Sequence, residues 1–279
     1  IIGAHGCGWT YAEDWSNYPY KARPSFGSSS PQEYSFSGIN FGSDPNKPHT
    51  RFFGSVNLKD NAIDVATLAE GIKESGLKMQ YILFDACYMG NVETAYELKD
   101  VTNYFIASSS EIIQYGLPYK LLWNYLNSPT PSYSSIVSTS INFYKTAKAP
   151  YLNIAAIDCR ELDGLANIMK EINSKYTLSE SIDPETIQHL DGFSPNLFYD
   201  MEAYVDSLYP SGYLLDQFKN QLKLTVKAAG HTDYAYSALY YKETFIEIKN
   251  YCGLSISDPS QNSVAIKGRE KTGWWKATH

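Results

Sequence analysis

Two strand-like segments of this chain end in side chains that together could serve as a nucleophile and its base. Residues 81–86 form an apolar run that stops at Cys87, and the first four residues run apolar into His5. Buried parallel strands have this composition, and open α/β folds place their chemistry at the carboxyl ends of such strands. A thiol and an imidazole at two strand ends predict a cysteine–histidine nucleophile site.

The residues beside both groups suit acyl transfer. Gly6 leaves its backbone amide open to approach, and we expect the amide of Cys87 to point into the same space and complete an oxyanion hole. Each such donor typically stabilises the transition state by about 2.7–4 kcal/mol. A helix is expected to begin just past Cys87, where its unpaired amides would lower the thiol pKa. A lone buried cysteine is more often structural, so the hypothesis depends on the pairing with His5.

The elements that would position these groups alternate between strands and helices. We expect a helix at 64–76, a strand at 80–86, a helix to about 100, a strand at 104–108, helices at 119–127 and 132–147, and a strand at 152–157. Asp158 and Glu161 form a capping box for a helix to about 176. Later segments are less regular, with helices near 199–208 and 213–229 and a strand near 234–241. This alternation predicts a largely parallel α/β sheet covered on both faces.

Composition excludes several classes of function. The net charge is -7 and no cluster of Lys and Arg is present, which argues against a nucleic-acid partner. The longest apolar runs are strand-sized, well short of the ~20 residues of a membrane span. The four cysteines form no C-x-x-C or C-x-x-H pair, so we expect neither a disulfide scaffold nor structural zinc. Cys7 could reach Cys87 in an inhibitory disulfide, but a bystander role is favoured because two strand-edge thiols rarely have the required geometry.

Two sequence blocks resemble the signatures of the clostripain-like cysteine peptidases, which share a clan with caspases, legumains and gingipains. The first is His-Gly-Cys-Gly-Trp at residues 5–9, and the second is Phe-Asp-Ala-Cys-Tyr-Met-Gly-Asn-Val-Glu at 84–93. Residues 107–111 with 116–119 add a less specific match. The resemblance implies a caspase-like α/β/α sandwich with a mostly parallel central sheet. We expect a peptidase core over residues 1–176 and a C-terminal subdomain over 177–279.

The resemblance also implies a reaction, the hydrolysis of peptide bonds after Arg or Lys through a thioester acyl-enzyme. It makes His5 the general base, Cys87 the nucleophile, and Gly6 with Cys87 the oxyanion amides. It places Asp85 at the base of the S1 site, which holds the residue before the scissile bond. A buried carboxylate that is unpaired in the free enzyme gains most from a substrate cation. The competing role for Asp85 is a carboxylate stabilised by the amides at a helix N-terminus.

No cofactor is required by this chemistry. Some relatives use calcium, which acidic loops of this chain could hold, but no D-x-D-x-D loop supports such a site. The expected partner is a protein or peptide substrate with a basic residue before the cleaved bond. The resemblance further suggests a secreted or bacterial envelope protein.

Maturation by cleavage is a further expectation from the resemblance. The family's opening strands are absent before His5, and the long loop at 11–58 is where family members often self-cleave after a basic residue. The candidates are Lys21, Arg23, Lys47, Arg51 and Lys59, with cleavage before Ile1 as the competing site. If the protein is processed, we expect the missing segment to remain bound as a second chain.

Two alternatives remain open. With 24 Tyr, the chain could be a catalytically silent module that binds glycan or protein on a peptidase scaffold, although the presence of both His5 and Cys87 argues against this. The second alternative is a cysteine transpeptidase of the same clan. An Arg- or Lys-based chloromethylketone should label Cys87 only in an enzyme, and ligation to an added amine would reveal a transpeptidase.

Overall fold

A computed structural model describes residues 1–11, 53–54, 62–113, 115–209, 211–238 and 244–279. The five basic residues expected as cleavage sites lie outside these ranges, namely Lys21, Arg23, Lys47, Arg51 and Lys59.

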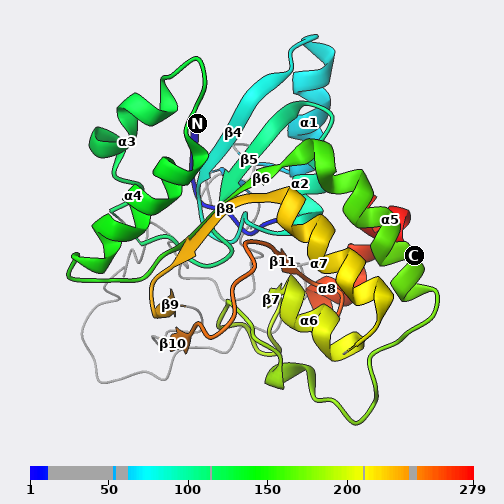
Figure 1. Ribbon diagram of the computed structural model, residues 1–279. Helices are drawn as coiled ribbons and strands as arrows, with labels where there is room; N and C mark the ends of the chain where they lie inside the picture. Colours follow the sequence, from blue (N-terminus) through cyan, green and yellow to red (C-terminus); the bar gives the residue numbers. More distant parts are fainter. Residues whose placement is uncertain (12–52, 55–61, 114, 210, 239–243) are drawn as a thin grey trace, which may run out of the picture.

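A five-stranded sheet in the order β1-β4-β5-β6-β8 lies at the centre of the fold (Figure 1). Its strands are β1 (Ile2–Gly3), β4 (Met79–Asp85), β5 (Thr102–Ala107), β6 (Asn153–Asp158) and β8 (Val226–His231). Neighbours β1, β4 and β5 pair in parallel, whereas β6 is antiparallel to both β5 and β8. Four of the five strands therefore run in one direction, which confirms the expected mostly parallel sheet and reverses only the strand expected at 152–157.

Helices cover both faces of this sheet (Figure 1). One face carries α1 (Val65–Glu74), α2 (Val92–Leu98), α5 (Leu162–Asn173) and α7 (Tyr213–Thr225), and the other carries α3 (Tyr119–Leu126) and α4 (Tyr133–Lys145). The side chains of β4 alternate between them, because Ile82 and Phe84 join the core under the first group while Leu83 joins the core under the second. This arrangement confirms the α/β/α sandwich.

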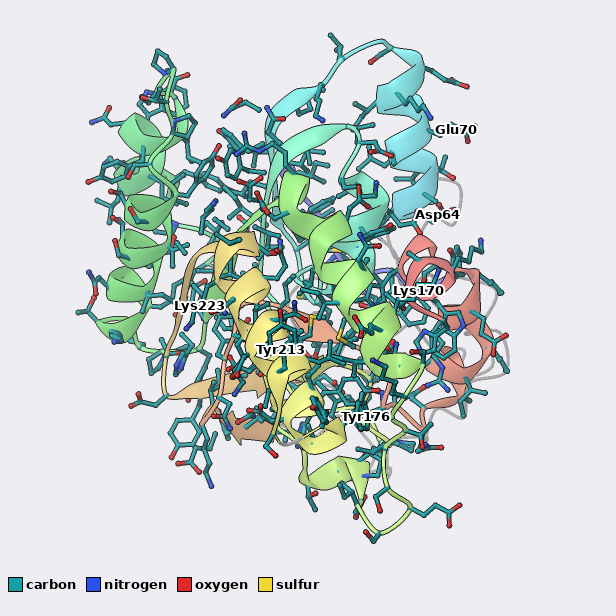
Figure 2. The ribbon with its side chains drawn as sticks, turned by 45° about the vertical axis from the view of Figure 1, so that its right-hand side comes forward. Asp64, Glu70, Lys170, Tyr176, Tyr213 and Lys223 are labelled. Carbon is teal, nitrogen blue, oxygen red and sulfur yellow. The ribbon has the colours of Figure 1, made fainter. Side chains whose placement is uncertain are left out.

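Local signals set the bounds of the helices. The side chain of Asp64 accepts a hydrogen bond from the Thr67 amide at the start of α1, and the helix ends just before Gly76, as the sequence predicts. Figure 2 shows α5 and α7 side by side, with Lys170 on α5 and Tyr213 on α7. The helix expected at 213–229 is shorter than predicted, because the chain leaves α7 and enters β8 directly.

The later part of the chain is built from short elements. They are β7 (Tyr199–Asp200), α6 (Met201–Leu208), β9 (Tyr234–Ser237), β10 (Thr244–Glu247), β11 (Ser255–Ile256), α8 (Ser263–Gly268) and α9 (Gly273–Thr278). Antiparallel pairs join β7 to β11, β9 to β10, and β2 (Phe53–Gly54) to β3 (Ala62–Ile63). Through β8 this later part also supplies a strand to the central sheet. The division into domains at residue 176 stays a prediction.

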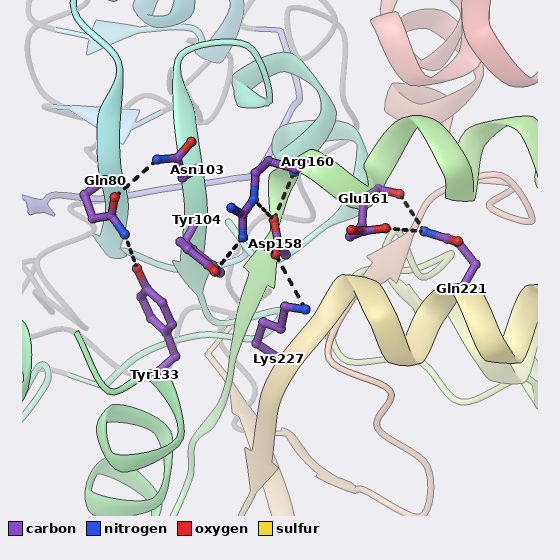
Figure 3. Close-up of polar contacts among 9 residues, drawn as sticks. All are labelled: Gln80, Asn103, Tyr104, Tyr133, Asp158, Arg160, Glu161, Gln221 and Lys227. Atoms are coloured by element: carbon purple, nitrogen blue, oxygen red, sulfur yellow. Dashed lines mark hydrogen bonds and ion pairs between the residues drawn. The ribbon is translucent and has the colours of Figure 1, made fainter. Parts of the chain in front are cut away.

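An ionic cluster lies at the end of β6, away from the carboxyl ends of β4 and β5 (Figure 3). The Asp158 carboxylate accepts hydrogen bonds of 2.7 and 2.6 Å from the Arg160 guanidinium, and Lys227 lies 3.6 Å away. Burial alone would raise the pKa of Asp158, but the hydrogen bonds and charge of Arg160 outweigh it and lower that pKa. The expected capping box is half right, since Asp158 accepts from the Arg160 amide whereas Glu161 accepts from Gln221.

Candidate active site

Cys87 lies in a turn between β4 and α2, and its side chain is only 4% exposed. The thiol donates a hydrogen bond of 3.7 Å to the carbonyl oxygen of Ile112. Burial raises the pKa of Cys87, and the negative charge of Glu111 raises it further. Helix α2 begins only at Val92, after the cap Asn91. The expected lowering of the thiol pKa by a helix N-terminus is therefore wrong for this conformation, in which the pKa is raised instead.

The segment that carries His5 runs against the Cys87 turn. Strand β1 pairs in parallel with the end of β4, and the Ala4 amide then donates to the carbonyl oxygen of Asp85 at 3.3 Å. At Gly6 the two segments touch, because an added Cβ would lie 2.6 Å from the carbonyl oxygen of Cys87. His5 stands between these two contacts. The structure therefore brings the backbone of His5 and Gly6 to the same sheet edge as Cys87.

The rest of the His-Gly-Cys-Gly-Trp block packs behind this edge. Gly8 has a φ of +63°, and an added Cβ would lie 2.7 Å from the carbonyl oxygen of Tyr88, so only glycine fits there. The buried Trp9 ring donates to the Ser257 hydroxyl at 3.0 Å. Cys7 shares an apolar cluster with Cys87, and no disulfide joins the cysteines of the described chain.

Asp85, the last residue of β4, is half-buried under the loop that follows β5. Its Oδ2 atom accepts hydrogen bonds from the Leu117 amide at 3.1 Å and the Tyr119 hydroxyl at 2.8 Å. Burial, followed by the charge of Asp85, raises the pKa of Tyr119, which keeps its hydroxyl a donor. Within the described ranges no cation forms an ion pair with Asp85. The cap of α2 is Asn91, so Asp85 does not serve as a helix N-terminal carboxylate.

A buried polar network fixes the first part of this loop. Ser108, Ser109 and Ser110 are all fully buried, and so is Asn153 at the start of β6. The Asn153 side chain accepts from the Ser109 amide at 2.8 Å and donates to the Ser110 hydroxyl at 2.6 Å. Because β6 is antiparallel to β5, its first residue lies at the edge where β5 ends. The reversed strand thus supplies a side chain to the candidate site.

Tyr88 and Glu111 also lie at the candidate site, and neither was predicted from the sequence to have a role there. Tyr88 has a positive φ of 58°, and among the described residues no other residue except glycine has one. Its hydroxyl donates to Oε1 of Glu111 at 2.7 Å. The sequence contained one indication of their place at the site. Tyr88 follows Cys87 directly, and Glu111 is the last residue of the segment 107–111 that also resembles the family.

Among the described residues, no three or more His, Cys, Asp and Glu side chains are grouped so that they could hold a metal ion. Whether calcium binds stays a prediction. Among the same residues, none of the helices has both the length and the apolar character of a membrane span.

Comparisons with known proteins place these features in a family. The clostripain family model matches residues 40–257. A secreted cysteine protease of Bacteroides thetaiotaomicron, iotapain, is 40% identical over 100% of this chain and 70% of its own, with a TM-score of 0.81. A clostripain from the same species, solved with a peptide inhibitor, is 44% identical over 82% of this chain and 99% of its own, with a TM-score of 0.76.

A third structure, an inactive zymogen protease of Parabacteroides distasonis, is 24% identical over 80% of this chain and 64% of its own, and it shares the fold with a TM-score of 0.70. No curated protein matches the chain. The family resemblance and the caspase-like fold are therefore confirmed, whereas the roles of His5, Gly6, Asp85 and Cys87 stay predictions. This chain belongs to the clostripain family and is a cysteine-type peptidase.

Proposed function

We propose that this peptidase is an endopeptidase that cleaves after Lys or Arg, with Cys87 as the nucleophile and His5 as the general base. The contact of Gly6 with the carbonyl oxygen of Cys87 supports the pairing most directly, because it sets the end of β1 against the turn after β4. Two catalytic groups on adjacent strand ends need no long loops to meet.

The reaction follows from these roles. His5 removes the proton from the Cys87 thiol, and the thiolate attacks the carbonyl carbon of the scissile bond to give a tetrahedral oxyanion. Collapse of this intermediate breaks the C–N bond, the leaving amine takes the proton from His5, and a thioester remains on Cys87. Water then gives a proton to His5 and attacks the thioester, which releases the acid and restores the thiol.

The amides of Gly6 and Cys87 are proposed to hold the oxyanion. Within the part of the chain that the structure describes, neither amide donates a hydrogen bond to a protein group. Both therefore keep their donor capacity for a substrate oxygen.

Asp85 is proposed to bind the basic side chain of the substrate. Its hydrogen bonds come from neutral donors, so no described cation competes there with the basic side chain of a substrate. The clostripain relative was solved with the inhibitor BTN-VLTK-AOMK, whose peptide part ends in K, for lysine. A carboxylate at this position and a lysine in that ligand both favour a basic P1 residue.

Activation is proposed to expose the thiol. In the present conformation Cys87 is buried and its pKa is raised, which opposes formation of the thiolate that would attack the substrate. Cleavage after a basic residue of the loop at 11–58 would permit a rearrangement that frees the thiol. The relatives from Bacteroides thetaiotaomicron include one described as secreted, which favours export of this protein too.

The test uses fluorogenic peptides with Lys, Arg, Asp or Asn before the cleaved bond. The matured protein should cleave the Lys and Arg peptides alone, Cys87→Ala should cleave none, and Asp85→Asn should lose about 10²-fold in kcat/KM for the basic pair. Cleavage after Asp or Asn would refute the role of Asp85. Silence from all four peptides after verified maturation would favour a binding module, and ligation to an added amine would indicate a transpeptidase.

A further inference from the structure

Glu111 joins three segments that are far apart in sequence. Its side chain is 2% exposed, and its Oε1 atom accepts from the Tyr88 hydroxyl at 2.7 Å, the Ser237 hydroxyl at 2.9 Å and the Ala238 amide at 2.9 Å. Tyr88 belongs to the Cys87 turn, whereas Ser237 and Ala238 lie at the end of β9. A buried carboxylate with several donors on one oxygen holds those donors in fixed directions.

Tyr88 links the Glu111 carboxylate to the backbone of the turn that carries Cys87. Tyr88 follows Cys87 directly and has a left-handed φ of 58°. A bulky residue rarely adopts this backbone conformation unless its surroundings hold it there. The Tyr88 amide donates to the carbonyl oxygen of Ser110 at 3.0 Å, and its ring stacks on Phe198 with centroids 5.5 Å apart. The hydroxyl bond to Glu111 fixes the far end of the same side chain.

Glu111 also precedes the residue that receives the thiol hydrogen bond. The carbonyl oxygen of Ile112 accepts from Cys87 Sγ, so the backbone beside Glu111 contacts the reactive atom directly. The turn that carries the thiol and the loop that receives it are therefore both tied to one carboxylate.

We infer that Glu111 is a positioning residue for the nucleophile: its carboxylate ties the Tyr88 hydroxyl to the end of β9 and so fixes the direction in which the turn presents Cys87. This inference rests on the proposed role of Cys87 in catalysis. It assigns Glu111 no contact with the substrate.

The test compares three variants with a matched control. Tyr88→Phe removes the hydroxyl and keeps the ring, Glu111→Ala removes the carboxylate, and Glu111→Gln keeps an acceptor oxygen for all three donors. The control is Tyr199→Phe, which removes another tyrosine bond to a glutamate, 2.9 Å long, from Tyr199 to Glu185. All proteins are matured alike, and their folding is checked by thermal unfolding.

The kinetic readout uses the Lys peptide. Tyr88→Phe and Glu111→Ala should lower kcat by about 10- to 100-fold with KM within about twofold, because misplacement of a reacting group by about 1 Å has effects of this size. Glu111→Gln should stay within about threefold of the wild type, as should the control. Equal kcat in Tyr88→Phe and Tyr199→Phe would overturn the inference.

A second readout follows the thiol itself and does not require peptidase activity. Rates of iodoacetamide alkylation of Cys87 against pH, measured on the protein before maturation, report its ionisation. Burial raises the pKa of Cys87 most, followed by the charge of Glu111, with smaller contributions from Cys7 and Asp85. Glu111→Gln should move the alkylation midpoint to lower pH, whereas the control should not. An unmoved midpoint would refute the proximity of Glu111 to the thiol even where Tyr88→Phe fails to fold. If the wild type is inactive but Glu111→Gln still has a lower alkylation midpoint than the wild type, the proposed function is refuted and the proximity of Glu111 to the thiol stands.

Discussion

Replacement of Gly6 by Ala tests how closely the His5 segment approaches the nucleophile. An added Cβ would lie 2.6 Å from the carbonyl oxygen of Cys87 and 2.9 Å from Sδ of Met89. Ordinary van der Waals contact begins at 3.4 Å, so the two segments must separate by about 0.8 Å. Methionine can rotate away, but the backbone carbonyl cannot move without the Cys87 turn.

The magnitude follows from this displacement. A shift of about 1 Å between reacting groups costs ~10²-fold in rate, and overpacking of a close contact costs about 1–3 kcal/mol of stability. Gly6→Ala should therefore lower kcat for the Lys peptide about 100-fold and lower the free energy of unfolding by about 1–3 kcal/mol.

Gly3→Ala is the matched control, because an added Cβ there meets nothing within 4 Å. It should leave kcat unchanged and the free energy of unfolding within about 0.5 kcal/mol of the wild type. Urea titration and steady-state kinetics measure both quantities. Identical behaviour of Gly6→Ala and Gly3→Ala in both assays would refute the packing of β1 against the Cys87 turn.

Three further substitutions probe the buried polar groups. Burial, and then the charge of Asp258, raises the pKa of Glu93 to about 8. The contribution of Glu93 to stability is therefore full below its ordinary pKa of 4.5 and is lost as pH rises towards 8. In urea titrations at several pH values, Glu93→Gln should reduce this loss of stability. The pKa of Asp158 is lowered, so its ion pair stabilises fully above the ordinary value of 3.8 and is lost as pH falls below that value and through the lowered pKa. The destabilisation by Arg160→Met should shrink over the same range of pH. Asn153→Ala removes the acceptor of the buried Ser109 amide and the donor to the buried Ser110 hydroxyl, and should lower the free energy of unfolding by about 1–3 kcal/mol. An unchanged free energy would contradict this expectation.

Much of the fold was predictable because local signals agree with it. The apolar run before Cys87 is a strand buried on both faces, and its successive side chains pack alternately into the two hydrophobic cores on either side of the sheet. The cap at Asp64 and the Gly76 stop mark the bounds of α1. The His5 and Cys87 segments were predicted to lie together because parallel neighbours end at one edge of a sheet.

Other features depend on contacts that the local sequence does not encode. An apolar strand such as β6 has the same composition in either direction, so its reversal, and the approach of Asn153 to the serine loop, could not be predicted. The protonation state of Cys87 depends on its burial and on Glu111, both set by tertiary packing. The hydrogen bonds of Asp85 come from Leu117 and Tyr119, which are more than thirty residues away.

The central claim, that Cys87 is the nucleophile and is assisted by His5, is tested most directly by labelling with a lysine-terminated chloromethylketone followed by peptide mapping. The three other cysteines, Cys7, Cys159 and Cys252, serve as internal controls. The matured wild type should carry the label on Cys87 alone, with the labelling rate reduced in His5→Ala and abolished in Cys87→Ala. Labelling of another cysteine, or an equal rate in His5→Ala, would contradict the proposed dyad.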